Sequence, residues 1–169
     1  MKAQGGQADK TEDGGGADGA FQPVAAVGLE GLPPFSKIKP EHVKPAVEQI
    51  IEQCRQTIET VVSQTVPFTW KNLVEPVDDI DDVLGKLWSP VSHMNSVVNS
   101  DELREAYESC LPLLSEYSTW VGQHKGLFNA YKQLADSAQL AQLTVAQQKQ
   151  VTNAWRDFTR SGIDVPAEK

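Results

Sequence analysis

The chain has 169 residues, of which 40% are hydrophobic, and its formal net charge at pH 7 is −8. This length is enough for one domain with a buried core. Because nucleic-acid binding requires a concentrated basic face, the acidic balance argues against a nucleic-acid partner. No apolar run approaches the ~20 residues of a membrane-spanning helix, so no membrane partner is expected either.

Residues 1–28 are expected to be a disordered or non-homologous N-terminal extension. Met1–Ala20 is rich in Gly, Asp, Gln and Ala, with no apolar residue large enough to anchor it, so burial cannot offset the entropy cost of ordering it. The segment also lacks the apolar core of a signal peptide, so nothing in it directs export, and a cytoplasmic location is expected. Its composition does not decide between a cloning tail, a misassigned start and a genuine extension.

A proline-restrained stretch precedes the first helix. Gly31–Phe35 contains Pro33 and Pro34, which force an extended path. Its apolar residues could dock into a groove of another protein as a proline-rich ligand. They could also pack on this chain's own domain as an ordered lead-in, and this second interpretation is favoured.

Five amphipathic helices are predicted after this stretch, so the expected fold class is all-α, a bundle of about five antiparallel helices. The first helix begins near Pro40, a favoured first-turn residue, and ends at Gln64–Pro67. Its apolar residues recur every three or four positions, which is typical of one helix face. They are Val43, Val47, Ile50, Cys54, Ile58 and Val61 or Val62.

The second helix starts near Thr69 and carries a proline well inside it. Pro90 predicts a kink after Ser89, because proline removes an amide and crowds the preceding turn. The apolar stripe of this helix is Val83, Leu87, Val91, Met94 and Val98.

The third helix runs from Asp101 to about Gly122, with Ser100 as the N-cap. Pro112 predicts a bend or a local break near Cys110. Its stripe is Leu103, Tyr107, Cys110 or Leu111, Leu114, Tyr117 and Val121. Because the stripes match and the joint is short, the second and third helices are expected to lie antiparallel and share a core.

Two shorter helices complete the predicted bundle. The fourth runs from about His124 to Ser137, and Thr144 with Gln147 predicts a capping box at the start of the fifth. Gly162 is a natural stop for the fifth helix. The predicted apolar residues are Leu127, Tyr131 and Leu134 on the fourth helix, and Val151, Ala154, Trp155 and Phe158 on the fifth.

The sequence contains no zinc-peptidase motif. HExxH places two histidines one helical turn apart to bind the metal, and its glutamate activates water. None of His42, His93 and His124 is followed by Glu or by a second His four residues on, and three scattered histidines do not make a metal site. No catalytic, cofactor-binding or metal-ligating residue is therefore predicted in this chain.

The remaining reactive residues also favour structural roles. Cys54 and Cys110 fall on apolar helix faces and are expected to be buried, reduced thiols, with a disulfide as the alternative. Burial would raise their pKa and lower their nucleophilicity. The aspartates between Val77 and Val83 lack the Gly and the terminal Glu of a calcium loop, so they are expected to form a solvated helix face. The four tryptophans, expected in the core or at an interface, are Trp70, Trp88, Trp120 and Trp155.

Three stretches, in the same order along the chain, carry a family resemblance. They are GLPPFSKIKPEHVKPAVEQII, SPVSHMNSVVNSDELREAYESCLPLLSEYSTWVGQHKGL and NAWRDFTRSGIDVPAEK. They resemble the N-terminal helical region of the oligopeptidase A group in the thimet oligopeptidase family of zinc metallopeptidases. The resemblance covers residues 29–169 and implies that they are the N-terminal helical domain of such a protein, truncated at its C-terminal end. Val165–Lys169 looks like the opening of a further helix, which agrees with truncation, although a frayed tail is the alternative.

The resemblance implies a fragment of a metallopeptidase that cleaves short peptides. In that family the zinc site lies in a channel between two helical halves, and the N-terminal helices form part of the channel wall. The expected partners are short peptides and the missing catalytic half of the same protein, which Trp120 and Trp155 are expected to face. Zinc belongs to the full-length family and no cofactor is expected in this chain, which alone should be inactive. The alternative is a free-standing helical protein-interaction module without enzymatic activity.

Deletion of Met1–Ala20 is expected to leave the thermal midpoint unchanged within error, because this stretch has no large apolar side chain whose burial would stabilise the fold. Calorimetry of the full and shortened chains measures the difference. A large drop would show that the segment packs on the domain.

Overall fold

The computed structural model describes residues 39–98 and 100–163, and these form an all-α structure, as predicted. No strand and no helix long and apolar enough to cross a membrane occurs in this part of the chain. The five α-helices are α2 (Pro40–Val62), α3 (Glu75–Val97), α4 (Asp101–Gly122), α5 (Lys125–Ala135) and α6 (Val145–Arg160). A π-helical turn, η2 (Trp70–Val74), precedes α3, and a 3-10 turn, η3 (Leu140–Gln142), precedes α6.

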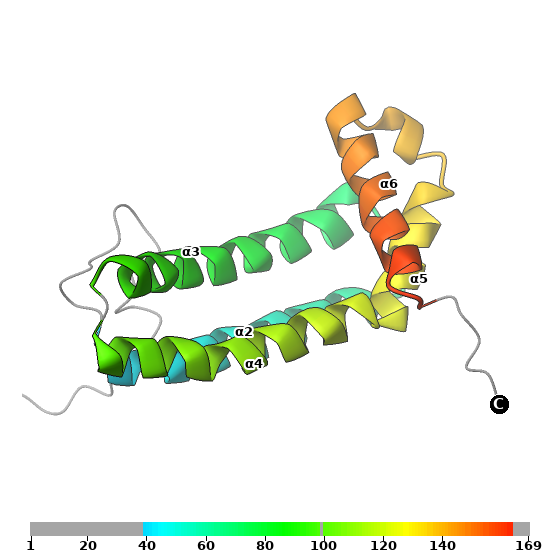
Figure 1. Ribbon diagram of the computed structural model, residues 1–169. Helices are drawn as coiled ribbons and strands as arrows, with labels where there is room; N and C mark the ends of the chain where they lie inside the picture. The colour runs from blue at the N-terminus through cyan, green and yellow to red at the C-terminus, as the bar shows by residue number, and fades with distance from the viewer. Residues whose placement is uncertain (1–38, 99, 164–169) are drawn as a thin grey trace, which may run out of the picture.

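The three long helices α2, α3 and α4 run alongside one another in alternating directions, whereas α5 and α6 form an antiparallel pair across one end (Figure 1). Helix α2 packs against both α3 and α4, and α5 packs mainly against α6. The predicted antiparallel packing of the second and third helices is therefore confirmed. The molecule has a long three-helix part and a transverse two-helix part.

Each part has its own hydrophobic core, and α2 contributes to both. In the long part, Val43, Val47, Ile50 and Cys54 of α2 pack with residues of α3 and α4. In the transverse part, the last turns of α2 contribute Ile58 and Val61, which pack with η2, α5 and α6. Every predicted stripe position of the first helix is buried except Val62, which is half-buried.

The predicted helix ends agree with the observed caps. The Ser100 hydroxyl accepts a hydrogen bond from the Leu103 amide at 3.2 Å. Thr144 and Gln147 form the expected reciprocal capping box at the start of α6. Gly162 has φ = +79° just after α6, a conformation that glycine adopts at little cost.

The start of the second predicted helix differs from a regular α-helix. Thr69 does begin helical structure, but the first five residues form the π-helical turn η2. This turn is held by a capping box between Thr69 and Asn72, and the Gln64 side chain donates to the Asn72 carbonyl at 3.0 Å. Sequence periodicity did not predict the turn, because π-helical hydrogen bonding leaves no signature in the apolar spacing.

The internal prolines do not interrupt their helices. Helix α3 is continuous through Pro90 and α4 through Pro112, so the predicted local break near Cys110 is wrong. Pro90 itself is buried in the helix packing. The bend predicted at each proline stays a prediction.

One stripe position differs from the prediction, and another decides between two predicted alternatives. Val98 is 59% exposed and lies just beyond Val97, where α3 ends. On α4, Cys110 takes the buried position, and Leu111 is exposed. The extension, the proline-rich stretch and the C-terminal residues from 164 onward lie outside the described residues.

Ile58→Ala should lower the free energy of unfolding by about 2–5 kcal/mol, because Ile58 is fully buried where α2 enters the transverse core. Urea unfolding followed by circular dichroism measures the change. The matched control, Val145→Ala, removes a side chain that is 82% exposed and should change stability by less than about 0.5 kcal/mol. Equal effects of the two substitutions would contradict the shared-core arrangement.

Candidate functional site

The residues that could bind zinc are dispersed over the structure. His42 lies on α2, His93 on α3, and His124 directly before α5. No group of three His, Cys, Asp or Glu side chains among the described residues could hold a metal ion. The side chains of residues 39–98 and 100–163 therefore do not form a site for the zinc ion of the family that the sequence resembles.

His124 has a structural role that occupies both of its ring nitrogens. Its Nδ1 accepts a hydrogen bond from the Leu127 amide at 3.0 Å and so caps α5. Because Nδ1 is the acceptor, Nε2 carries the proton and donates to the Glu59 carboxylate at 3.1 Å. The ring also meets Trp120 edge-on at 4.8 Å. The sequence predicted that a helix starts near His124, but it did not predict that the His124 side chain caps this helix.

Both cysteines are free and buried, as predicted. Burial raises the pKa of the Cys54 thiol to about 11, and its Sγ donates weakly to the Ile80 carbonyl at 3.7 Å. Burial also raises the pKa of Cys110. Neither thiol is thus a ready nucleophile at neutral pH, because the thiolate is the reactive form.

The tryptophans pack within the domain and do not form an exposed face. Trp88 of α3 stacks on Tyr107 of α4 at 4.9 Å. Trp120 lies under the Arg55 guanidinium at 4.8 Å, and Trp155 packs against the transverse core. Trp120 and Trp155 are both partly buried. The expectation that they face a missing partner stays a prediction. The exposed large hydrophobic side chains of the described chain are Val66, Val97, Val98, Leu111 and Val145.

The structure places part of the aspartate run at a cavity. This cavity, called here the α3–α6 cavity, has a volume of about 320 Å³ and lies where α3, α4, α5 and α6 meet. Its carboxylates are Asp78 and Asp81 of α3 and Asp157 of α6. Its apolar lining is Val77, Val121, Leu127, Ala154 and Phe158, and its other lining residues are Ser118, Gly122, Tyr131 and Ser161.

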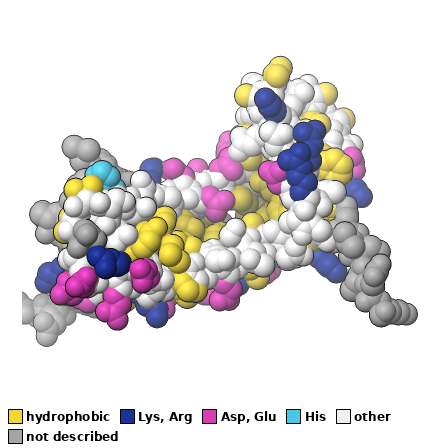
Figure 2. Space-filling view, viewed as in Figure 1, with side chains coloured by type: hydrophobic (Ala, Val, Ile, Leu, Met, Phe, Trp, Pro, Cys, Tyr) yellow, Lys and Arg dark blue, Asp and Glu magenta, His cyan; other side chains and the backbone are white. Residues whose placement is uncertain are grey.

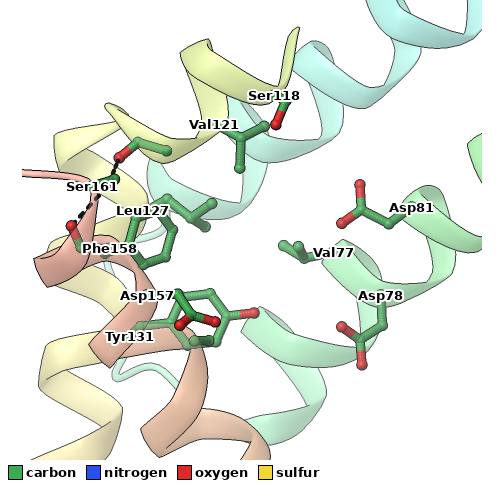
Figure 3. Close-up of a pocket in the computed structure, with 12 residues that line it drawn as sticks. Val77, Asp78, Asp81, Ser118, Val121, Leu127, Tyr131, Asp157, Phe158 and Ser161 are labelled. Carbon is green, nitrogen blue, oxygen red and sulfur yellow. Dashed lines mark hydrogen bonds between the residues drawn. The ribbon is translucent and has the colours of Figure 1, made fainter. Parts of the chain in front are cut away.

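The α3–α6 cavity combines an apolar floor with an acidic rim. Figure 3 shows Asp78 and Asp81 on one side and Asp157 on the other, with the Tyr131 hydroxyl directed toward α3 between them. On the whole molecule, hydrophobic side chains are visible in the hollow between the long helices, and acidic side chains lie along the same face (Figure 2). The aspartates of the run are exposed, as expected of a solvated helix face. The sequence did not predict the cavity beside them, because Asp157 is far away in the chain.

Asp81 connects the cavity to the core of the long part. The buried Tyr117 hydroxyl donates to the Asp81 carboxylate at 3.2 Å. Burial raises the pKa of the Asp81 carboxyl above its usual value of 3.8, and neighbouring Asp78 raises it further, whereas the Tyr117 hydrogen bond lowers it. Burial also raises the pKa of Tyr117, so this phenol stays neutral and acts as a donor.

Comparison with known proteins gives the family. Residues 47–169 match the family model for the neurolysin/thimet oligopeptidase N-terminal domain. The chain belongs to this family. The match begins within α2 and includes η2 and the later helices of the described chain, so it covers residues from both parts and the α3–α6 cavity.

Individual relatives of this N-terminal domain agree with the family model. The chain is 60% identical over 141 residues to oligopeptidase A of Haemophilus influenzae, covering 83% of this chain and 21% of the relative. It is 62% identical over 138 residues to oligopeptidase A of Escherichia coli, covering 82% and 20%. A probable cytosolic oligopeptidase A of Arabidopsis thaliana is 30% identical over 138 residues, with 82% and 20% covered. The chain therefore spans about a fifth of the length of these relatives.

Asp81→Asn should make the stability of this N-terminal domain less dependent on pH. The pKa of the Asp81 carboxyl is higher in the folded chain than in the unfolded chain. As the pH rises, the unfolded chain therefore loses this proton at a lower pH than the folded chain. The folded wild type should therefore lose stability as the pH rises from about 3.8 through the higher folded-state pKa. Asparagine keeps an oxygen that accepts from Tyr117 but does not titrate.

Urea midpoints measured for both chains between about pH 3 and pH 7 give the comparison. Asp79→Asn, at an exposed position of α3, is the control for the loss of one carboxylate charge. A wild-type profile that stays parallel to the Asp81→Asn profile would contradict the assignment.

Proposed function

We propose that this chain is the N-terminal helical part of a zinc metallo-oligopeptidase that cleaves short peptides. In this proposal it forms part of the channel wall, and the zinc site belongs to another part of the full-length protein. The observation that carries the proposal is the family match over residues 47–169, combined with described residues that offer no grouping of metal ligands.

The surface of the domain supports a role in shape and access. A hollow on one face combines hydrophobic and acidic side chains (Figure 2). Polypeptide ligands bind such surfaces through apolar contact and a small number of polar groups. The proposed partners are accordingly short peptides, reached through the full-length enzyme, and the catalytic half of the same protein. The proposed location is the cytoplasm, in line with the relative named as a probable cytosolic oligopeptidase A.

The second candidate is a free-standing helical interaction module without enzymatic activity. The observation that favours it is the closure of both cores within the described chain. Residues such as Ile50, Leu87 and Leu134 are fully or nearly fully buried without any partner chain. None of the large side chains exposed on the described surface is aromatic. A domain with these properties can be stable without a partner chain, and an independent module requires such stability.

The purified chain should bind no stoichiometric zinc and should cleave no short peptide. The reason is that His42, His93 and His124 lie on separate elements, and the ring nitrogens of His124 are occupied by Leu127 and Glu59. Metal analysis after dialysis and an assay with a quenched fluorescent peptide provide the two measurements. One tightly held zinc per chain, lost in His93→Ala, would overturn this expectation.

Complementation distinguishes the two candidate functions. The chain is mixed with the remaining four-fifths of an oligopeptidase A relative, expressed separately, and cleavage of a short peptide is followed. Restored cleavage supports the fragment, whereas a chain that neither associates nor restores activity supports the independent module. Sequencing the coding DNA beyond Lys169 is a simpler test, because the fragment requires a continuing frame that encodes HExxH.

A further inference from the structure

The hydroxyl of a buried residue faces the α3–α6 cavity. Tyr131 is 4% exposed, and its ring packs against Phe158 with ring centroids 5.9 Å apart. Its hydroxyl points into the cavity (Figure 3) and forms no hydrogen bond with any described residue. Because this hydroxyl opens into the cavity, its hydrogen bond is available to whatever occupies the cavity. The cavity therefore offers a polar ligand a hydrogen-bonding group that no described residue uses.

The charge around this hydroxyl is negative. The Tyr117 hydroxyl donates to Asp81, and the Gln150 side-chain amide donates to Asp78, so both carboxylates have neutral partners. Asp157 alone has a cationic neighbour, Arg160, at 3.6 Å on the exposed side of α6. No Lys, Arg or His is among the described residues that line the cavity. A carboxylate can accept about four hydrogen bonds, so all three retain capacity for a cation.

The shape and lining of the cavity select the kind of cation. A bare metal ion is disfavoured, because these carboxylates do not converge into a metal-binding group. The floor is apolar and includes Val77, Leu127 and Phe158, which are at most 8% exposed. Such a floor suits the aliphatic stem of a long side chain, whereas the rim suits its charged head. A volume of about 320 Å³ lies at the small end of ligand sites, so it admits a side chain and not a folded element.

We propose that the α3–α6 cavity binds an arginine side chain presented by a polypeptide partner. The guanidinium lies between Asp78, Asp81 and Asp157, and its stem covers the apolar floor. Its five donors in a fixed plane can reach carboxylates on both sides of the cavity and can also donate to the Tyr131 oxygen. Burial raises the pKa of Tyr131, and Asp78 and Asp81 raise it further, so the phenol stays neutral and can accept such a bond. The proposal concerns binding by this chain alone and does not rest on the peptidase assignment.

The test is an NMR titration of the ¹⁵N-labelled full chain with acetyl-Ala-Arg-Ala-amide, in which the Gly122 amide reports on the cavity. The expected result is saturable binding that weakens as salt is added. The matched peptide with Gln in place of Arg should bind at least about tenfold more weakly, because it lacks the charge.

Three variants locate the bound side chain. Asp78→Asn and Asp157→Asn should each weaken binding by about three- to tenfold. Tyr131→Phe should weaken it by about two- to tenfold while leaving the thermal midpoint unchanged or higher, because the lost hydroxyl has no partner within the described chain. Asp79→Asn is the matched control, since this carboxylate is exposed on α3 but does not line the cavity, and it should leave the affinity unchanged.

Several outcomes would overturn the proposal. They are an absence of binding at millimolar peptide, binding that the three cavity variants leave unchanged, and equal weakening by the Asp79→Asn control. Equal affinity for the matched lysine peptide would overturn the assignment to arginine. Equal affinity for free arginine amide would overturn the assignment to a polypeptide partner.

Discussion

Both hydrophobic cores of the described chain are completed by one face of α2. This helix buries eight residues, of which those up to Cys54 belong to the core of the long part, and Ile58 and Val61 belong to the core of the transverse part. Burial of an aliphatic side chain contributes about 1.5–3 kcal/mol, whereas a whole domain is stable by only about 5–15 kcal/mol. The contacts of α2 are therefore comparable in size to the net stability of the domain. The positions of the other helices, and of the cavity between them, depend on this helix.

Polar groups occur at the borders of these cores, where their hydrogen bonds also set the geometry. Tyr117 is buried on α4, and its hydroxyl reaches Asp81 on α3, which fixes the two helices relative to each other next to the cavity. His124 joins the start of α5 to Glu59 on α2 through its two ring nitrogens. The junction between the long and transverse parts is thus held by directional contacts in addition to apolar packing. A cavity at such a junction keeps its shape, because its walls belong to elements that are each fixed to a core.

The α3–α6 cavity bears on both functions proposed for this domain. The domain presents an acidic, partly apolar hollow on rigid helices, and a surface of this kind can select the charge and shape of a polypeptide. Selection of this kind affects which polypeptides associate and leaves the chemistry to other residues. A channel wall that selects peptides and an interaction module that binds a partner would both use this surface. Both candidate functions therefore agree with one fold.

The sequence by itself determined the helices, their buried faces and the absence of a zinc motif. Stripe residues such as Ile50 and Leu127, and caps such as Ser100 and Thr144, were predictable because helical periodicity and capping are local. The sequence left Cys110 and Leu111 as alternatives, and packing against α2 and α3 buried Cys110. Helix α4 also continued through Pro112, because tertiary packing outweighs local preference. Only the tertiary structure decided the cavity. Asp78 and Asp157 are 79 positions apart in the chain, and their approach across the cavity depends on how α3 and α6 pack, which no local pattern encodes.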